Sequence, residues 1–67
     1  MEFIEKAKIR IEHWIEHNEH HIEEYKDFVD SLKRAGKLKS AQYMEEMINL
    51  VSKSNEILRN ALDALEE

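Results

Sequence analysis

One segment of the chain, residues 11–25, gathers side chains that bind metal ions. It reads IEHWIEHNEHHIEEY and holds all four histidines and five glutamates, with no lysine or arginine. Imidazole and carboxylate groups bind borderline divalent metals, and imidazole also titrates near neutral pH. The segment therefore indicates a site for a divalent transition metal, with zinc, nickel, cobalt and copper as the candidates.

The spacing of three histidines suits a chelating site on a helix. His13, His17 and His21 follow one another at intervals of four residues, so neighbouring members face each other across one helical turn. Two such neighbours can hold one ion, and Glu24, three residues after His21, can add a carboxylate. We therefore predict His21 and His17 as the first metal ligands, with His13 and Glu24 next. We expect His20 to be a solvated surface residue.

Known catalytic motifs do not fit this segment. The helical zinc-protease motif needs Glu directly after its first His, but Asn18 follows His17. Di-iron carboxylate bundles use Glu-x-x-His, and no histidine here has Glu three residues before it. No Ser-His-Asp arrangement is recognisable either, and a chain of two helices offers little concave surface. We therefore expect no enzymatic activity.

Two long helices must position these side chains, because the only break signal is AGKLKS at residues 35–40. Gly36 adopts a left-handed conformation at little cost and suits the position just after a helix end. Ser40 can cap the next helix, which could begin as early as Lys37. Apolar residues recur at helical spacing on both sides of this break. We predict an all-α fold, an antiparallel helical hairpin in a single domain of residues 1–67, with helices at about 2–34 and about 39–66.

The apolar stripes on both helices are wider than one hairpin can cover. A chain of 67 residues is also short for a stable single core, and the absence of cysteine excludes disulfides. Two hairpins packed as a four-helix bundle would cover both stripes. We therefore expect a homodimer, or a higher homo-oligomer, that forms a four-helix bundle.

A polar layer interrupts both stripes at the same level. Asn18 and His21 occupy core positions of the first helix, and Ser54 and Asn55 occupy core positions of the second. In an antiparallel hairpin that turns near Gly36, Asn18 lies opposite Asn55. Buried polar groups cost free energy unless they are paired, so we expect these residues to pair with each other.

Charge and hydropathy limit the partners. The formal net charge of −5 argues against nucleic acid, which needs clustered lysine and arginine, and against an anionic membrane surface. No apolar run reaches the ~18 to 20 residues of a membrane span. The charged N-terminal sequence MEFIEKAKIR does not suit a signal peptide, and the lack of cysteine is compatible with a reducing compartment. We expect a cytoplasmic protein.

The segment HWIEHNEHHIEEY at residues 13–25, together with NEILRNAL at residues 55–62, resembles an uncharacterised family of small two-helix proteins, mostly archaeal. The family's segment runs close to HWIEHNEEHAEEY. The matching positions are His13, His17, Asn18, His21 and Tyr25, and the departures are His20 and Ile22, which stand where the family has Glu and Ala. The resemblance covers nearly the whole chain. It implies a helical hairpin and, through a loose association with nickel and cobalt uptake, a transition metal.

Three functions are compatible with these patterns. The first is a non-enzymatic, metal-binding helical hairpin that acts in sequestration, sensing or delivery. The alternative is a structural or assembly module whose buried His and Asn layer sets register and oligomeric state without metal. The third is a pH-responsive interface, in which four histidines gain charge beside five glutamates.

Overall fold

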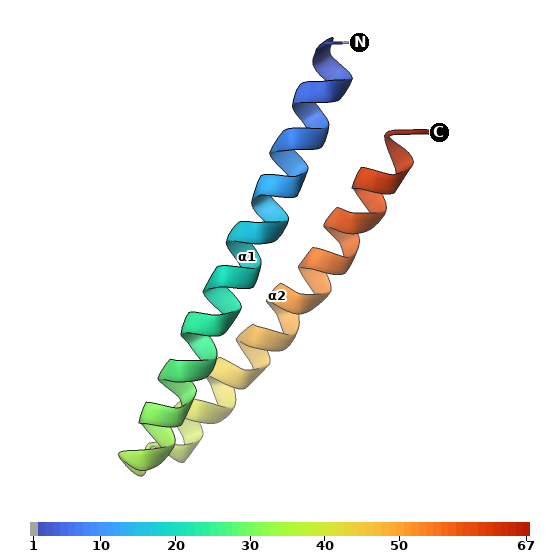
Figure 1. Ribbon diagram of the computed structural model, residues 1–67. Helices are drawn as coiled ribbons and strands as arrows, with labels where there is room; N and C mark the ends of the chain where they lie inside the picture. Colours follow the sequence, from blue (N-terminus) through green and yellow to red (C-terminus); the bar gives the residue numbers. More distant parts are fainter. Residues whose placement is uncertain (1) are drawn as a thin grey trace.

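The computed structural model describes residues 2–67, which form two helices and no strands (Figure 1). Helix α1 spans Glu2–Arg34 and helix α2 spans Leu38–Ala64. The two helices lie side by side and antiparallel, so both ends of the described chain lie opposite the turn. The resulting hairpin is 53 Å long and 15 Å wide. The predictions of an all-α fold and of two helices are confirmed.

Helix α1 ends because Gly36 reverses the backbone. Its φ of 77° lies in the left-handed region that favours glycine. The N–H of Gly36 donates to the carbonyl of Lys33 at 3.0 Å, and the N–H of Lys37 donates to the carbonyl of Leu32 at 2.9 Å. This pair of hydrogen bonds is the Schellman pattern, which satisfies carbonyls that the end of a helix leaves without partners.

The start of α2 differs from the prediction that Ser40 caps it. The N-cap is Lys37, whose side chain makes no capping hydrogen bond. The N–H of Ala41 already donates to the carbonyl of Lys37 at 3.0 Å, so the helical ladder begins there. The turn around Gly36 thus leads directly into the helix, and Ser40 lies within its first turn.

The seam between the helices buries few side chains. The buried residues are Ile15, Val29, Ala41 and Asn55. Ile15 and Val29 are two heptads apart, so they share one face of α1. Large apolar side chains outside this seam stay exposed, including Trp14 at 48% and Phe28 at 53% of their full accessible surface. One hairpin therefore covers only part of its apolar stripes.

Three ion pairs join α1 to the second half of the hairpin, two of them to α2 and one to Glu66 just beyond the end of α2. They join Lys8 to Glu66 at 3.4 Å, Glu19 to Arg59 at 3.1 Å, and Lys33 to Glu45 at 3.5 Å. All six side chains are about half exposed or more, so each pair contributes no more than about 1 kcal/mol. The three pairs agree on one antiparallel register.

Neither α1 nor α2 contains an apolar stretch long enough to cross a lipid bilayer.

We predict that Gly36→Ala lowers the free energy of unfolding by about 1 to 2 kcal/mol, because a Cβ disfavours positive φ. An added Cβ would meet no atom within 4 Å, so the cost is conformational and not steric. Urea denaturation followed by circular dichroism measures the effect. Lys37→Ala is the control and should stay within about 0.5 kcal/mol of the natural protein. Equal stability of the Gly36→Ala variant would contradict this account of the turn.

Candidate functional site

A hydrogen-bonded amide pair lies in the middle of the seam. Asn18 donates from Nδ2 to Oδ1 of Asn55 at 2.8 Å, and Asn55 donates from its own Nδ2 to the carbonyl of Ile15 at 3.1 Å. Asn55 is buried, with 6% of its surface exposed, and both ends of its amide are occupied. No buried side-chain N or O atom among residues 2–67 lacks a partner. The structure thus brings Asn18 and Asn55 together across the two helices.

Ser54 lies outside this pair, unlike in the predicted layer. Its side chain is exposed, whereas the neighbouring Asn55 is buried. One residue corresponds to about 100° around a helix, so when Asn55 points at α1, Ser54 points past it.

A second contact in this region joins His17 and His21 of α1. It is exposed, whereas the hydrogen bond between Asn18 and Asn55 is part-buried. The Nε2 atoms of the two rings are 2.9 Å apart, and the rings meet edge to face with centroids 4.4 Å apart. The other face of the pair is supported by Tyr25, whose ring stacks on His21 at 5.8 Å with an angle of 13° between planes. The predicted i, i+4 neighbours are therefore in contact.

Glu24 contacts the opposite nitrogen of His21. Its Oε1 lies 3.5 Å from Nδ1, whereas Nε2 faces His17. A proton on Nδ1 directed at Glu24 leaves the Nε2 lone pair of His21 free to accept, and Nε2–H of His17 then donates to it. A carboxylate on the far nitrogen of a histidine fixes the ring and its tautomer. Glu24 is thus placed to orient His21, and not beside the Nε2 atoms as a further ligand.

The separation of the two Nε2 atoms suits a chelated metal. Metal–nitrogen bonds of about 2.0–2.1 Å place two adjacent ligands of one ion about 2.9–3.4 Å apart, depending on the coordination geometry. The observed 2.9 Å falls at the short end of that range. An ion could take the place of the shared proton if both rings turned so that their Nε2 lone pairs converged on it.

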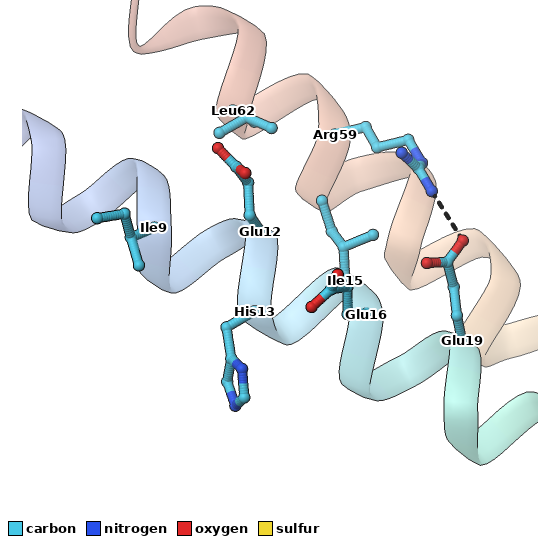
Figure 2. A pocket seen from close by; sticks show the side chains of 8 residues that line it. All are labelled: Ile9, Glu12, His13, Ile15, Glu16, Glu19, Arg59 and Leu62. Atoms are coloured by element: carbon cyan, nitrogen blue, oxygen red, sulfur yellow. Dashed lines mark hydrogen bonds and ion pairs between the residues drawn. The ribbon is translucent and has the colours of Figure 1, made fainter.

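The other two histidines face elsewhere. His13 stacks on His17 with centroids 6.0 Å apart, and Figure 2 shows its ring pointing away from α2. It borders an open hollow of about 520 Å³ that is also lined by Glu12, Glu16 and Arg59. His20 lines a separate surface hollow among glutamates. The structure thus brings together His17, His21 and Glu24 of the predicted ligands, and it leaves His13 at the edge of the set.

A single hairpin does not close a metal cage. Within residues 2–67, no group of three or more His, Cys, Asp or Glu side chains is arranged to hold an ion. The paired imidazoles could therefore supply at most two ligands to an ion, and its remaining coordination positions would have to be filled by solvent or by another molecule.

Two contributors to this region were not among the predicted site residues. Tyr25 supports His21, and the backbone carbonyl of Ile15 accepts from Asn55. The i, i+4 spacing of Tyr25 from His21 was a usable signal for the first. A backbone acceptor carries no signal in side-chain identity, so the second could not be found that way.

Fold and site together define a helical hairpin with a part-buried amide pair and two imidazoles in contact. The chain belongs to the DUF8180 family, a domain of unknown function, whose model matches residues 7–65. This match is consistent with the predicted membership of an uncharacterised family. Neither the curated proteins nor the solved structures gave a match.

We predict that Asn55→Asp destabilises the hairpin by about 2 to 4 kcal/mol. The new carboxylate would be buried, and one of its oxygens would face the Ile15 carbonyl, which also accepts. Thermal and urea unfolding would measure the loss. Ser54→Ala is the matched control at the adjacent position and should change stability by less than about 0.5 kcal/mol. A large effect of the Ser54 substitution would show that the layer is wider than the amide pair.

Proposed function

We propose that this protein is a non-enzymatic helical hairpin that binds a divalent transition metal ion through Nε2 of His17 and Nε2 of His21. The observation that carries the proposal is the 2.9 Å separation of these two atoms. Zinc, nickel, cobalt and copper all accept imidazole nitrogen, so the ligand type leaves these four ions as candidates. The loose association of the resembled sequence pattern with nickel and cobalt uptake is compatible with the same class of ion.

The neighbours of the pair support a holding role. Glu24 lies against Nδ1 of His21, and Tyr25 stacks on the ring of the same residue. These contacts fix the direction of a ligand before the ion arrives, which reduces the ordering that binding requires. Sequestration, sensing or delivery of the ion in the cytoplasm is the function that such a site serves.

The same proposal includes a homodimer that forms a four-helix bundle. Its support is the apolar surface that the hairpin leaves exposed, which includes Trp14, Phe28, Tyr43 and Met47. Phe28, Tyr43 and Met47 line one open hollow, and exposed apolar patches on a small protein mark an interaction surface. The acidic balance of the chain favours a protein partner over nucleic acid.

A second candidate is an assembly module that binds no metal. The buried amide pair of Asn18 and Asn55 favours it, because a single polar contact in an apolar seam selects one register. The two candidates differ in whether they need His17 and His21. The metal-binding hairpin needs both imidazoles, and assembly without metal needs neither.

We expect the untagged protein to bind zinc or cobalt with micromolar or tighter affinity in a competition assay against a chromogenic chelator. His17→Ala combined with His21→Ala should weaken binding by about 100-fold or more, because both donor atoms are lost. Glu24→Gln should weaken it by about 10- to 100-fold through loss of the carboxylate that orients His21.

His20→Ala is the matched control, since it removes an exposed histidine from the same helix and should leave affinity unchanged. Equal affinity of the double variant and the natural protein would rule out the His17–His21 site. Assembly that ignores both chelator and the double substitution, with no metal bound, would support the second candidate instead.

A further inference from the structure

We propose that one metal ion is shared by two copies of this chain, each of which supplies His17 and His21, on a two-fold axis that passes α1 midway between these two residues. This inference rests on the proposed metal binding and adds where the second copy sits. The resulting site has four imidazole ligands, two from each copy.

The first argument is that the site of one chain is incomplete. Zinc and its neighbours complete their coordination with four or more ligands, and structural sites supply all of them from protein. One hairpin provides two nitrogens 2.9 Å apart, and no third side chain of residues 2–67 completes the group. A second copy brings an identical pair and fills a tetrahedral set without any further residue type.

The second argument is the place of His21 on the open face. Its side chain is 39% exposed, although it sits at the level of the buried amide pair. Trp14 lies seven residues before it and Phe28 seven residues after it, and residues at this spacing share one face of a helix. All three side chains are therefore on the side of α1 that α2 leaves uncovered.

The third argument is the symmetry that the ion imposes. An ion bound to Nε2 of both histidines lies between the two residues, so a two-fold axis through the ion places His17 of one copy opposite His21 of the other. The second copy is then antiparallel, and Trp14 lies at the level of Glu24 and Tyr25 of the second copy. The two copies overlap along α1 over residues 4–34, which is nearly the whole helix. An axis displaced along the helix would separate the two histidine pairs.

The fourth argument is the shape of the face on either side of His21. An open hollow of about 700 Å³ is lined by Tyr25, Phe28, Tyr43 and Met47. It has room for the indole of Trp14 from the second copy, and aromatic side chains gain from such contacts. The two copies overlap along about 46 Å of helix and the hairpin is 15 Å wide, so each chain would cover on the order of 700 Å², close to the size of a stable interface.

This arrangement fixes the direction of the second hairpin. With the axis perpendicular to the helices, α1 packs on α1 of the second copy and the two turns around Gly36 lie at opposite ends of the bundle. The other two-fold arrangement, with its axis along the helices, places both turns at the same end. In that bundle α1 faces α2 of the second copy, and the two histidine pairs lie on a diagonal, too far apart to share an ion.

Metal stoichiometry tests the shared site. Cobalt(II) added to the apo protein should bind at one ion per two chains, give the visible absorption of a tetrahedral site, and yield a dimer in light scattering. A ratio of one ion per chain would overturn the sharing while leaving the proposed metal binding intact. Absence of cobalt binding would overturn both, so the two failures are distinguishable.

Spin labelling tests the direction of the hairpins. The chain has no cysteine, so Lys37→Cys provides a single attachment site beside the turn. Pulsed dipolar measurements on the cobalt-free, zinc-loaded dimer should give a distance of about 50–55 Å, because each label lies about 27 Å along the helix from the axis. A distance below about 25 Å would place the turns at one end and overturn the proposed axis.

A pair of matched variants tests the interface. Trp14→Ala should weaken zinc-dependent dimerisation at least 10-fold, because its ring meets the second copy. Leu50→Ala removes a more exposed apolar side chain, 67% accessible, about 180° around α2 from the buried Ala41, and should leave dimerisation unchanged. Circular dichroism confirms that both variants stay helical. Equal dimerisation of the two variants would place the second copy on another face.

Discussion

The constraint on which this structure depends is that two helices share only one seam. Each helix can turn one strip of its surface toward the other, and the apolar stripes of this sequence are wider than that strip. The seam is consequently thin, with Ile15, Val29 and Ala41 as its buried apolar residues. Large apolar side chains at the edges of the seam stay partly exposed, and Trp14 and Phe28 are about half exposed.

The functional character of the open face follows from the same constraint. Asn18 falls on the side of α1 that meets α2, and it pairs with Asn55. His21, three residues later, falls on the side that stays uncovered, with His17 and Tyr25 against its ring. Asn18 and His21, which interrupt the same apolar stripe of α1, therefore lie on two different sides of the helix. The amides align the two helices of one chain, and the imidazoles remain available for something outside it.

Much of the fold could be predicted from residue patterns, and the reasons are specific. A single glycine between two long stretches of helical periodicity determines where the hairpin turns, and Gly36 does adopt positive φ. The opposition of Asn18 and Asn55 followed from counting residues away from that turn. The role of Ser40 could not be read in the same way, because a backbone turn that already satisfies the end of α1 needs no side-chain cap at the start of α2.

Which histidine and glutamate side chains meet was predictable from their spacing, but the geometry of their contacts was less so. Spacing by four residues places His17 and His21 in contact, yet helical angles alone do not say which nitrogen faces which partner. Glu24 shows the difference, since it reaches Nδ1 of His21 and not the atom that faces His17. Ser54 shows another limit, because a rotation of one residue separates a buried position from an exposed one. Rotamers and helix rotation, which sequence spacing leaves open, decide both cases.

The hydrogen bond from Asn55 to the carbonyl of Ile15 has a mechanical consequence for the neighbouring rings. Apolar side chains alone allow one helix to roll a little about its long axis against another, because dispersion contacts have no preferred direction. The amide of Asn55 makes two hydrogen bonds to α1. Its oxygen accepts from the side chain of Asn18, and its nitrogen donates to the carbonyl of Ile15, three residues earlier. Any roll of α1 would stretch one of these directional bonds. These bonds fix the rotation of α1 about its own axis within one turn of His17. They therefore also fix the direction in which the imidazoles point relative to the whole hairpin.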